Sequence, residues 1–183
     1  MNFSTTLKAS AIAVSMMLAG GAQATALSKS EYKQAKERAE ASYKSEKANC
    51  GAMSGNAKDI CMEEAKGHER VAKAEAEYSY SKKGKDLVAL NKAKVESNYK
   101  VAKERCDDQN GNAKDVCIKE AKATRDKGMA DIKANKEIGE ARKDAADTKR
   151  DADYKVAAEK CDAMSGDAKS TCVKSAKSQY GKM

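Results

Sequence analysis

The sequence predicts an all-α protein built from three disulfide-stapled antiparallel αα-hairpin repeats, arranged as an elongated helical bundle or a string of hairpins. A segment of about two dozen residues occurs three times, and each copy carries two of the six cysteines, always 11 positions apart. The chain contains no Pro and is 35% charged, a composition that favours helices and leaves few bulky apolar residues for a core. The three copies are Tyr43–Lys66, Tyr99–Lys122 and Tyr154–Lys177.

The cysteine spacing requires the chain to reverse within each copy if the two cysteines are bonded. On one continuous helix, residues 11 positions apart have Cα atoms roughly 16 Å apart, whereas a disulfide needs Cα atoms within about 7 Å of each other. The first cysteine lies five residues before a central Gly and the second lies six after it, at matching heights of an antiparallel hairpin. The repeat therefore predicts the pairs Cys50–Cys61, Cys106–Cys117 and Cys161–Cys172.

The centre of each copy has the residues of a helix–turn–helix reversal. A Gly can adopt the left-handed conformation that ends many helices. The Asn or Asp after it can accept a hydrogen bond from the first amides of the next helix, and a polar residue three positions later can complete a rough capping box. The turn and cap candidates are Gly55 and Asn56, Gly111 and Asn112, and Gly166 and Asp167, followed by Asp59, Asp115 and Ser170.

Other roles for the cysteines fit the pattern less well. Structural zinc takes four Cys or His ligands at close spacing, and the one histidine, His68, lies on the Ala-rich stripe of its predicted helix, where we expect a packed or half-exposed side chain. No C-x-x-C redox pair occurs, although the second cysteine of each copy would lie near a helix N-terminus, where a thiol pKa is lowered. The turn at 107–112 lacks the Gly and Glu of a calcium loop. We expect disulfides, no metal site and no cofactor.

Residues 1–26 have the pattern of a signal peptide. Lys8 precedes an apolar run at 9–19 that is too short to span a bilayer, and Ala24-Thr25-Ala26 forms an A-x-A cleavage site. Export would place the six cysteines in an oxidising compartment, where they would pair. We therefore expect a periplasmic or secreted protein that begins at Leu27 and has no transmembrane segment in the mature chain.

The rest of the chain divides into hairpin repeats at 27–84, 85–136 and 137–183. At the first join, Gly84 and Asp86 predict a turn and a cap for the following helix. At the second join, a turn near 134–139 would give six antiparallel helices, and its absence would leave 113–163 as one rod; we favour the turn. Ala-lined seams bury little apolar area, so a partly frayed string of stapled hairpins is the alternative to a compact bundle.

The signal peptide, the Ala/Lys/Glu-rich helices and the repeated C-x4-G-[ND]-A-K-x2-C motif together resemble a family of small exported helical repeat proteins of proteobacteria. Some members of this family are labelled TolA-like, after a cell-envelope protein with an Ala/Lys/Glu-rich helical stalk. The resemblance covers nearly the whole mature chain and implies an envelope or periplasmic location.

The sequence favours a structural or interaction protein, with an unidentified protein or envelope component as partner and self-association as a further option. It lacks a Ser-His-Asp pattern, a Gly-rich phosphate loop and a metal-ligand cluster, so we do not expect an enzyme. The formal net charge of +8 suggests an alternative, weak binding of a polyanion such as lipopolysaccharide, an acidic glycan or extracellular DNA. The basic residues are interleaved with acidic ones, and Lys82, Lys83 and Lys85 form the tight cluster, so we expect no sequence-specific nucleic-acid recognition.

Overall fold

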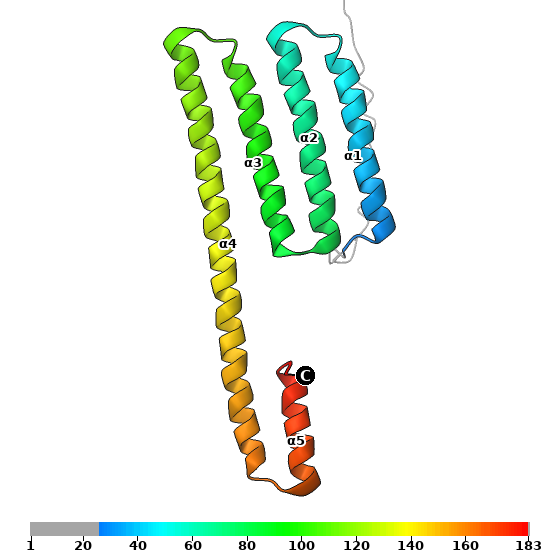
Figure 1. The fold of residues 1–183 in the computed structure, drawn as a ribbon, viewed down its shortest axis with the longest axis vertical. Helices are drawn as coiled ribbons and strands as arrows, with labels where there is room; N and C mark the ends of the chain where they lie inside the picture. The colour runs from blue at the N-terminus through cyan, green and yellow to red at the C-terminus, as the bar shows by residue number, and fades with distance from the viewer. Residues whose placement is uncertain (1–25, 183) are drawn as a thin grey trace, which may run out of the picture.

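The structure is a computed structural model that describes residues 26–182, so all of the expected signal peptide except Ala26 lies outside the described residues. Within this range the chain forms helices and no strands, which confirms the all-α fold class. The helices are α1 (Lys29–Cys50), α2 (Gly55–Ser81), α3 (Gly84–Cys106), α4 (Gly111–Asp162) and α5 (Gly166–Gln179). Figure 1 shows them as a chain of antiparallel hairpins.

The three disulfides connect the predicted pairs and close the turn end of each hairpin. They are Cys50–Cys61, Cys106–Cys117 and Cys161–Cys172, each with a Cα–Cα distance of 5.6 Å. The first cysteine of each pair is the last or next-to-last residue of its helix and is at most 1% exposed. The cross-links therefore lie inside the helix–helix seams, next to the turns.

The three turns share one geometry, which corrects the predicted capping roles. Gly55, Gly111 and Gly166 have φ values of +56°, +55° and +59°, so the predicted left-handed glycines are confirmed. However, each glycine starts the second helix instead of ending the first, because the residue before it, Ser54, Asn110 or Ser165, is the extended N-cap. Asn56, Asn112 and Asp167 therefore lie one residue inside their helices, where a side chain cannot cap the first amides.

Side chains near the turns form other contacts in place of the predicted caps. At the starts of α2, α4 and α5 the N-cap residue makes no side-chain cap hydrogen bond, and Ser170 donates its hydroxyl to the Asp167 carbonyl. The Asn56 amide donates to the Glu104 carbonyl at 2.9 Å, which joins the first turn to the end of α3. Across the second and third turns, the Lys of the repeated Ala-Lys pairs with the Asp after the first cysteine. These pairs are Lys114–Asp107 at 2.8 Å and Lys169–Asp162 at 2.9 Å.

The predicted turn between α2 and α3 is confirmed, but different residues make it. Lys82 adopts the left-handed conformation, with φ +53°, that ends α2. Asp86 does not cap α3; its carboxylate accepts a hydrogen bond from the Ser81 hydroxyl at 2.6 Å, and that hydroxyl accepts one from the Lys83 amide at 3.1 Å. Ser81 thus links the end of one helix to the first turn of the next.

The expected turn near 134–139 is wrong, because α4 runs without a break through this stretch for 52 residues. A Gly inside a helix costs only about 1 kcal/mol relative to Ala, and the surrounding residues are strong helix formers. Ion pairs at i,i+4 also span the stretch, with Lys133–Glu137 at 3.8 Å and Lys136–Glu140 at 3.4 Å. The boundary expected between 136 and 137 therefore lies inside α4, whose two halves belong to the second and third hairpins.

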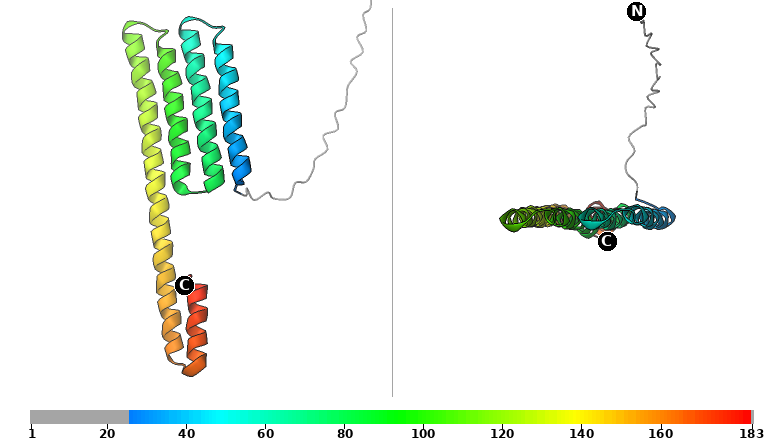
Figure 2. Two further views of the ribbon diagram at one scale, coloured as in Figure 1. Left: turned by 45° about the vertical axis from the view of Figure 1, so that its right-hand side comes forward. Right: turned by 90° about the horizontal axis from the view of Figure 1, so that it is seen from above.

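Helices α1 to α4 lie side by side in one flat layer (Figures 1 and 2). Each helix contacts only its neighbours in sequence, and no other helix pair within residues 26–182 is in contact. The second half of α4 extends past the layer and packs with α5 alone (Figure 1). Among residues 26–182, both faces of the layer are consequently open, and these helices do not form a closed bundle.

The apolar core of residues 26–182 is thin. Among the buried apolar residues of this range only Leu90 and Ile132 are bulky, and other bulky side chains such as Leu87 and Ile138 are exposed. Small residues line the helix–helix seams and allow the helices to approach closely. The other buried apolar residues are Ala39, Cys50, Ala65, Ala76, Cys106, Ala121, Cys161 and Ala176.

Tyrosines pack at the ends of the first and third hairpins that lie far from the disulfides. The Tyr32 and Tyr80 rings stack with their centroids 4.9 Å apart, and Tyr154 meets Tyr180 edge to face at 6.4 Å. Each of these two hairpins is therefore fixed at one end by a covalent bond and at the other by an aromatic pair.

The seam between α3 and α4 has no space for a residue larger than glycine at position 128, and this allows a matched test within α4. A Cβ at Gly128 would lie 2.9 Å from Val95 Cγ2, whereas a Cβ at Gly139 would meet nothing within 4 Å. We expect Gly128→Leu to lower the free energy of unfolding by about 1–3 kcal/mol through overpacking, and Gly139→Leu to cause no loss. Urea denaturation of both variants checks this; equal effects would contradict the close approach of α3 and α4.

The third hairpin should depend on its disulfide more than the first does. Helix α5 has 14 residues, contacts only α4, and has Ala176 as its buried residue, whereas α2 contacts both α1 and α3. A disulfide closing a loop of about a dozen residues stabilises by roughly 3 kcal/mol. In Cys161→Ala/Cys172→Ala we expect the α5 amides to lose hydrogen-exchange protection, and in Cys50→Ala/Cys61→Ala we expect α2 to keep most of its protection. Retained protection of α5 in the first variant would contradict this dependence.

Candidate functional site

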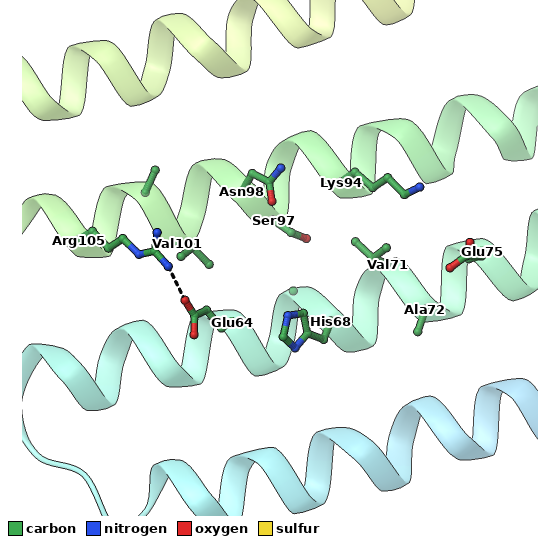
Figure 3. A pocket seen from close by; sticks show the side chains of 12 residues that line it. Glu64, His68, Val71, Ala72, Glu75, Lys94, Ser97, Asn98, Val101 and Arg105 are labelled. Atoms are coloured by element: carbon green, nitrogen blue, oxygen red, sulfur yellow. Dashed lines mark hydrogen bonds and ion pairs between the residues drawn. The ribbon is translucent and has the colours of Figure 1, made fainter. Parts of the chain in front are cut away.

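A groove with a volume of about 830 Å³ lies between α2 and α3 (Figure 3). Its floor combines buried and half-buried small residues with two valines. Its edges carry polar and charged side chains from both helices. The lining residues are Glu64, Gly67, His68, Val71, Ala72 and Glu75 of α2, and Lys94, Ser97, Asn98, Val101, Ala102 and Arg105 of α3.

At the floor of the groove, α2 and α3 approach each other closely. Gly67 is buried, and a Cβ added there would lie 3.1 Å from the Ser97 Cβ. Ser97 is itself 6% exposed, and its hydroxyl accepts a hydrogen bond from the Arg70 guanidinium at 2.8 Å. This bond satisfies the buried hydroxyl, so a small polar residue can occupy the seam without an unpaired group.

The two edges of the groove differ in charge. The α2 edge carries Glu64 and Glu75, and the α3 edge carries Lys94 and Arg105. Glu64 and Arg105 form an ion pair of 2.7 Å across one end of the groove, while Glu75 and Lys94 lie toward the other end (Figure 3). The groove therefore has an apolar floor between an acidic wall and a basic wall.

His68 pairs with a carboxylate of α1. Its Nδ1 lies 2.8 Å from Glu46 Oε2, and its side chain is 70% exposed. Burial raises the pKa of Glu46, but hydrogen bonds with His68 and Ser42 lower it by more, so the pKa of this carboxyl lies below its ordinary value. His68 is more exposed than the packed or half-exposed side chain expected from the sequence, and it joins α1 to the edge of the groove.

The residues singled out from the sequence do not gather at this groove. The cysteines and the glycines of the turns lie at the hairpin ends, where they fix the chain reversals. The basic cluster lies on the opposite turn, between α2 and α3, where Lys82, Lys83 and Lys85 are all exposed. The groove was not predicted from the sequence; an interior glycine such as Gly67 was the available signal for a close helix approach.

No group of three or more His, Cys, Asp and Glu side chains in residues 26–182 is arranged to hold a metal ion. In the same range, no helix is both long enough and apolar enough to cross a membrane. What the groove can provide is an apolar surface for another helix, with charges that set its orientation.

Comparison of the chain with protein-family models, with curated proteins and with solved structures gives no match.

Proposed function

We propose that the protein is a non-enzymatic structural or interaction protein of the periplasm or cell envelope, in which stapled hairpins hold an open layer of helices against which a partner packs. The observation that carries this proposal is that α1 to α4 form one layer, with contacts only between sequential helices. Stable domains usually pack two layers around a core. A rigid single layer has a face ready to receive a second one.

The disulfides support an extracytoplasmic location. Three of them hold all six cysteines, and such bonds persist in oxidising compartments such as the periplasm. The sequence of residues 1–26 adds the expectation of a signal peptide cleaved after Ala26. We therefore place the protein in the periplasm or outside the cell.

An interaction role also suits the distribution of charge better than polyanion binding does. Many lysines have a carboxylate beside them, and Lys73 contacts both Glu40 at 2.9 Å and Glu69 at 2.8 Å. Alternating charges of this kind keep a helix surface solvated and neutralise local positive potential. Further pairs are Lys33–Glu37, Lys66–Glu63, Lys114–Asp107, Lys133–Glu137 and Lys169–Asp162.

In vivo photo-cross-linking at matched positions tests the proposal. Asn98 lines the groove, and Lys100, two residues later, points about 200° away around the same helix. With a photo-reactive amino acid at either position, we expect irradiation of intact cells to give discrete adducts from position 98 and few from position 100. Because a packed partner would cover one face, adducts from neither position would contradict an interaction role, and an equal, unselective pattern from both would remove the groove as its site.

A further inference from the structure

We propose that a second copy of the chain packs face to face on the groove between α2 and α3, so that the two α2–α3 pairs form a four-helix arrangement across a two-fold axis. This inference rests on the proposed interaction role and names the partner. Helices in such an arrangement place small and apolar residues at the centre and charged residues at the edges. The groove already has this distribution on one side.

The floor of the groove supplies the centre of the interface. Val71, Ala72, Val101 and Ala102 line it and are only half-buried in the single chain. Helix α3 has 23 residues and is therefore about 35 Å long. Two adjacent helices are about 20 Å wide, so this face offers roughly 700 Å² per copy. A standard protein interface buries about 800 Å² per partner.

The charged edges make the groove complementary to itself. The α2 edge is acidic and the α3 edge is basic. When the α2 of a second copy lies over the α3 of the first, Glu64 and Glu75 of the second copy face basic residues of the first. Glu64 and Arg105 lie near one end, and Glu75 and Lys94 lie toward the other (Figure 3). A two-fold axis parallel to the helices keeps these heights, so it pairs Glu64 with Arg105 and Glu75 with Lys94 between the copies.

The same charges reject the other face-to-face arrangement. A two-fold axis in the plane of the layer but perpendicular to the helices would place α2 over α2 and α3 over α3. Glutamates would then oppose glutamates, and Lys94 would oppose Arg105, which is unfavourable. Interfaces with two-fold symmetry are self-complementary, and here the charges select the parallel axis.

Charge reversal at the edge of the groove tests the dimer. Lys94 and Glu75 are exposed, and neither takes part in an ion pair recorded within residues 26–182. Lys92, also exposed, is two residues before Lys94 and about 200° around α3, outside the groove. Sedimentation equilibrium of the oxidised chain from Leu27 to its C-terminus would compare Lys94→Glu, the matched control Lys92→Glu, and the swap Glu75→Lys/Lys94→Glu.

We expect the unchanged chain to form a dimer. Lys94→Glu should weaken association about tenfold, because the new carboxylate faces Glu75 of the other copy and the two-fold axis makes this repulsion occur twice. Lys92→Glu should change the association constant less than twofold. The swap should recover dimerisation, because it restores opposite charges between the copies. A monomer at concentrations of about 100 μM, equal weakening by both single variants, or no recovery in the swap would overturn the inference. A monomeric protein that still gave groove adducts in cells would retain the proposed interaction role with a different partner.

Discussion

The structure depends on one constraint: a disulfide between cysteines 11 positions apart, which a continuous helix cannot form. Each bond requires a chain reversal, which occurs at a left-handed glycine, so the two helices joined by each bond form an antiparallel hairpin. Because the bond lies at the turn end of each hairpin and its first cysteine is buried, it also sets the relative heights of the two helices of that hairpin. With a core of mainly Ala and Cys, apolar burial alone would give these hairpins little stability.

The hairpins were predictable because the sequence repeats the same cysteine pair and glycine three times, so each copy supports the reading of the others. The course of α4 was not predictable. Gly139 and Asn135 favour a turn, whereas the flanking helix formers and ion pairs favour a continuous helix, and the two contributions to the free energy are of similar size. The groove was not predictable either. It depends on the register that places Gly67 beside Ser97, and that register is set by contacts between residues far apart in sequence.

The cross-linked hairpins also determine which surface is open to a partner. Short joins and local cross-links place each helix beside its predecessor. No helix contact within residues 26–182 folds the layer back on itself, so in this range the apolar floor between α2 and α3 stays open. A closed bundle of the same helices would bury Val71 and Val101 inside one chain. In the open layer these residues, with an acidic wall and a basic wall beside them, are available to a second molecule.

The separation of α1 from α4 tests the single layer most directly. Ser45 of α1 and Ala123 of α4 are exposed and lie at similar depths below the turns, so spin labels carried there by non-natural amino acids leave all six cysteines paired. With labelled chains diluted into unlabelled protein, pulsed electron spin resonance should give a distance of about 24–30 Å plus the label length, because three helix-to-helix steps of 8–10 Å separate the sites. A distance of about one step, roughly 10 Å before the label length, would show a closed bundle and contradict the open layer.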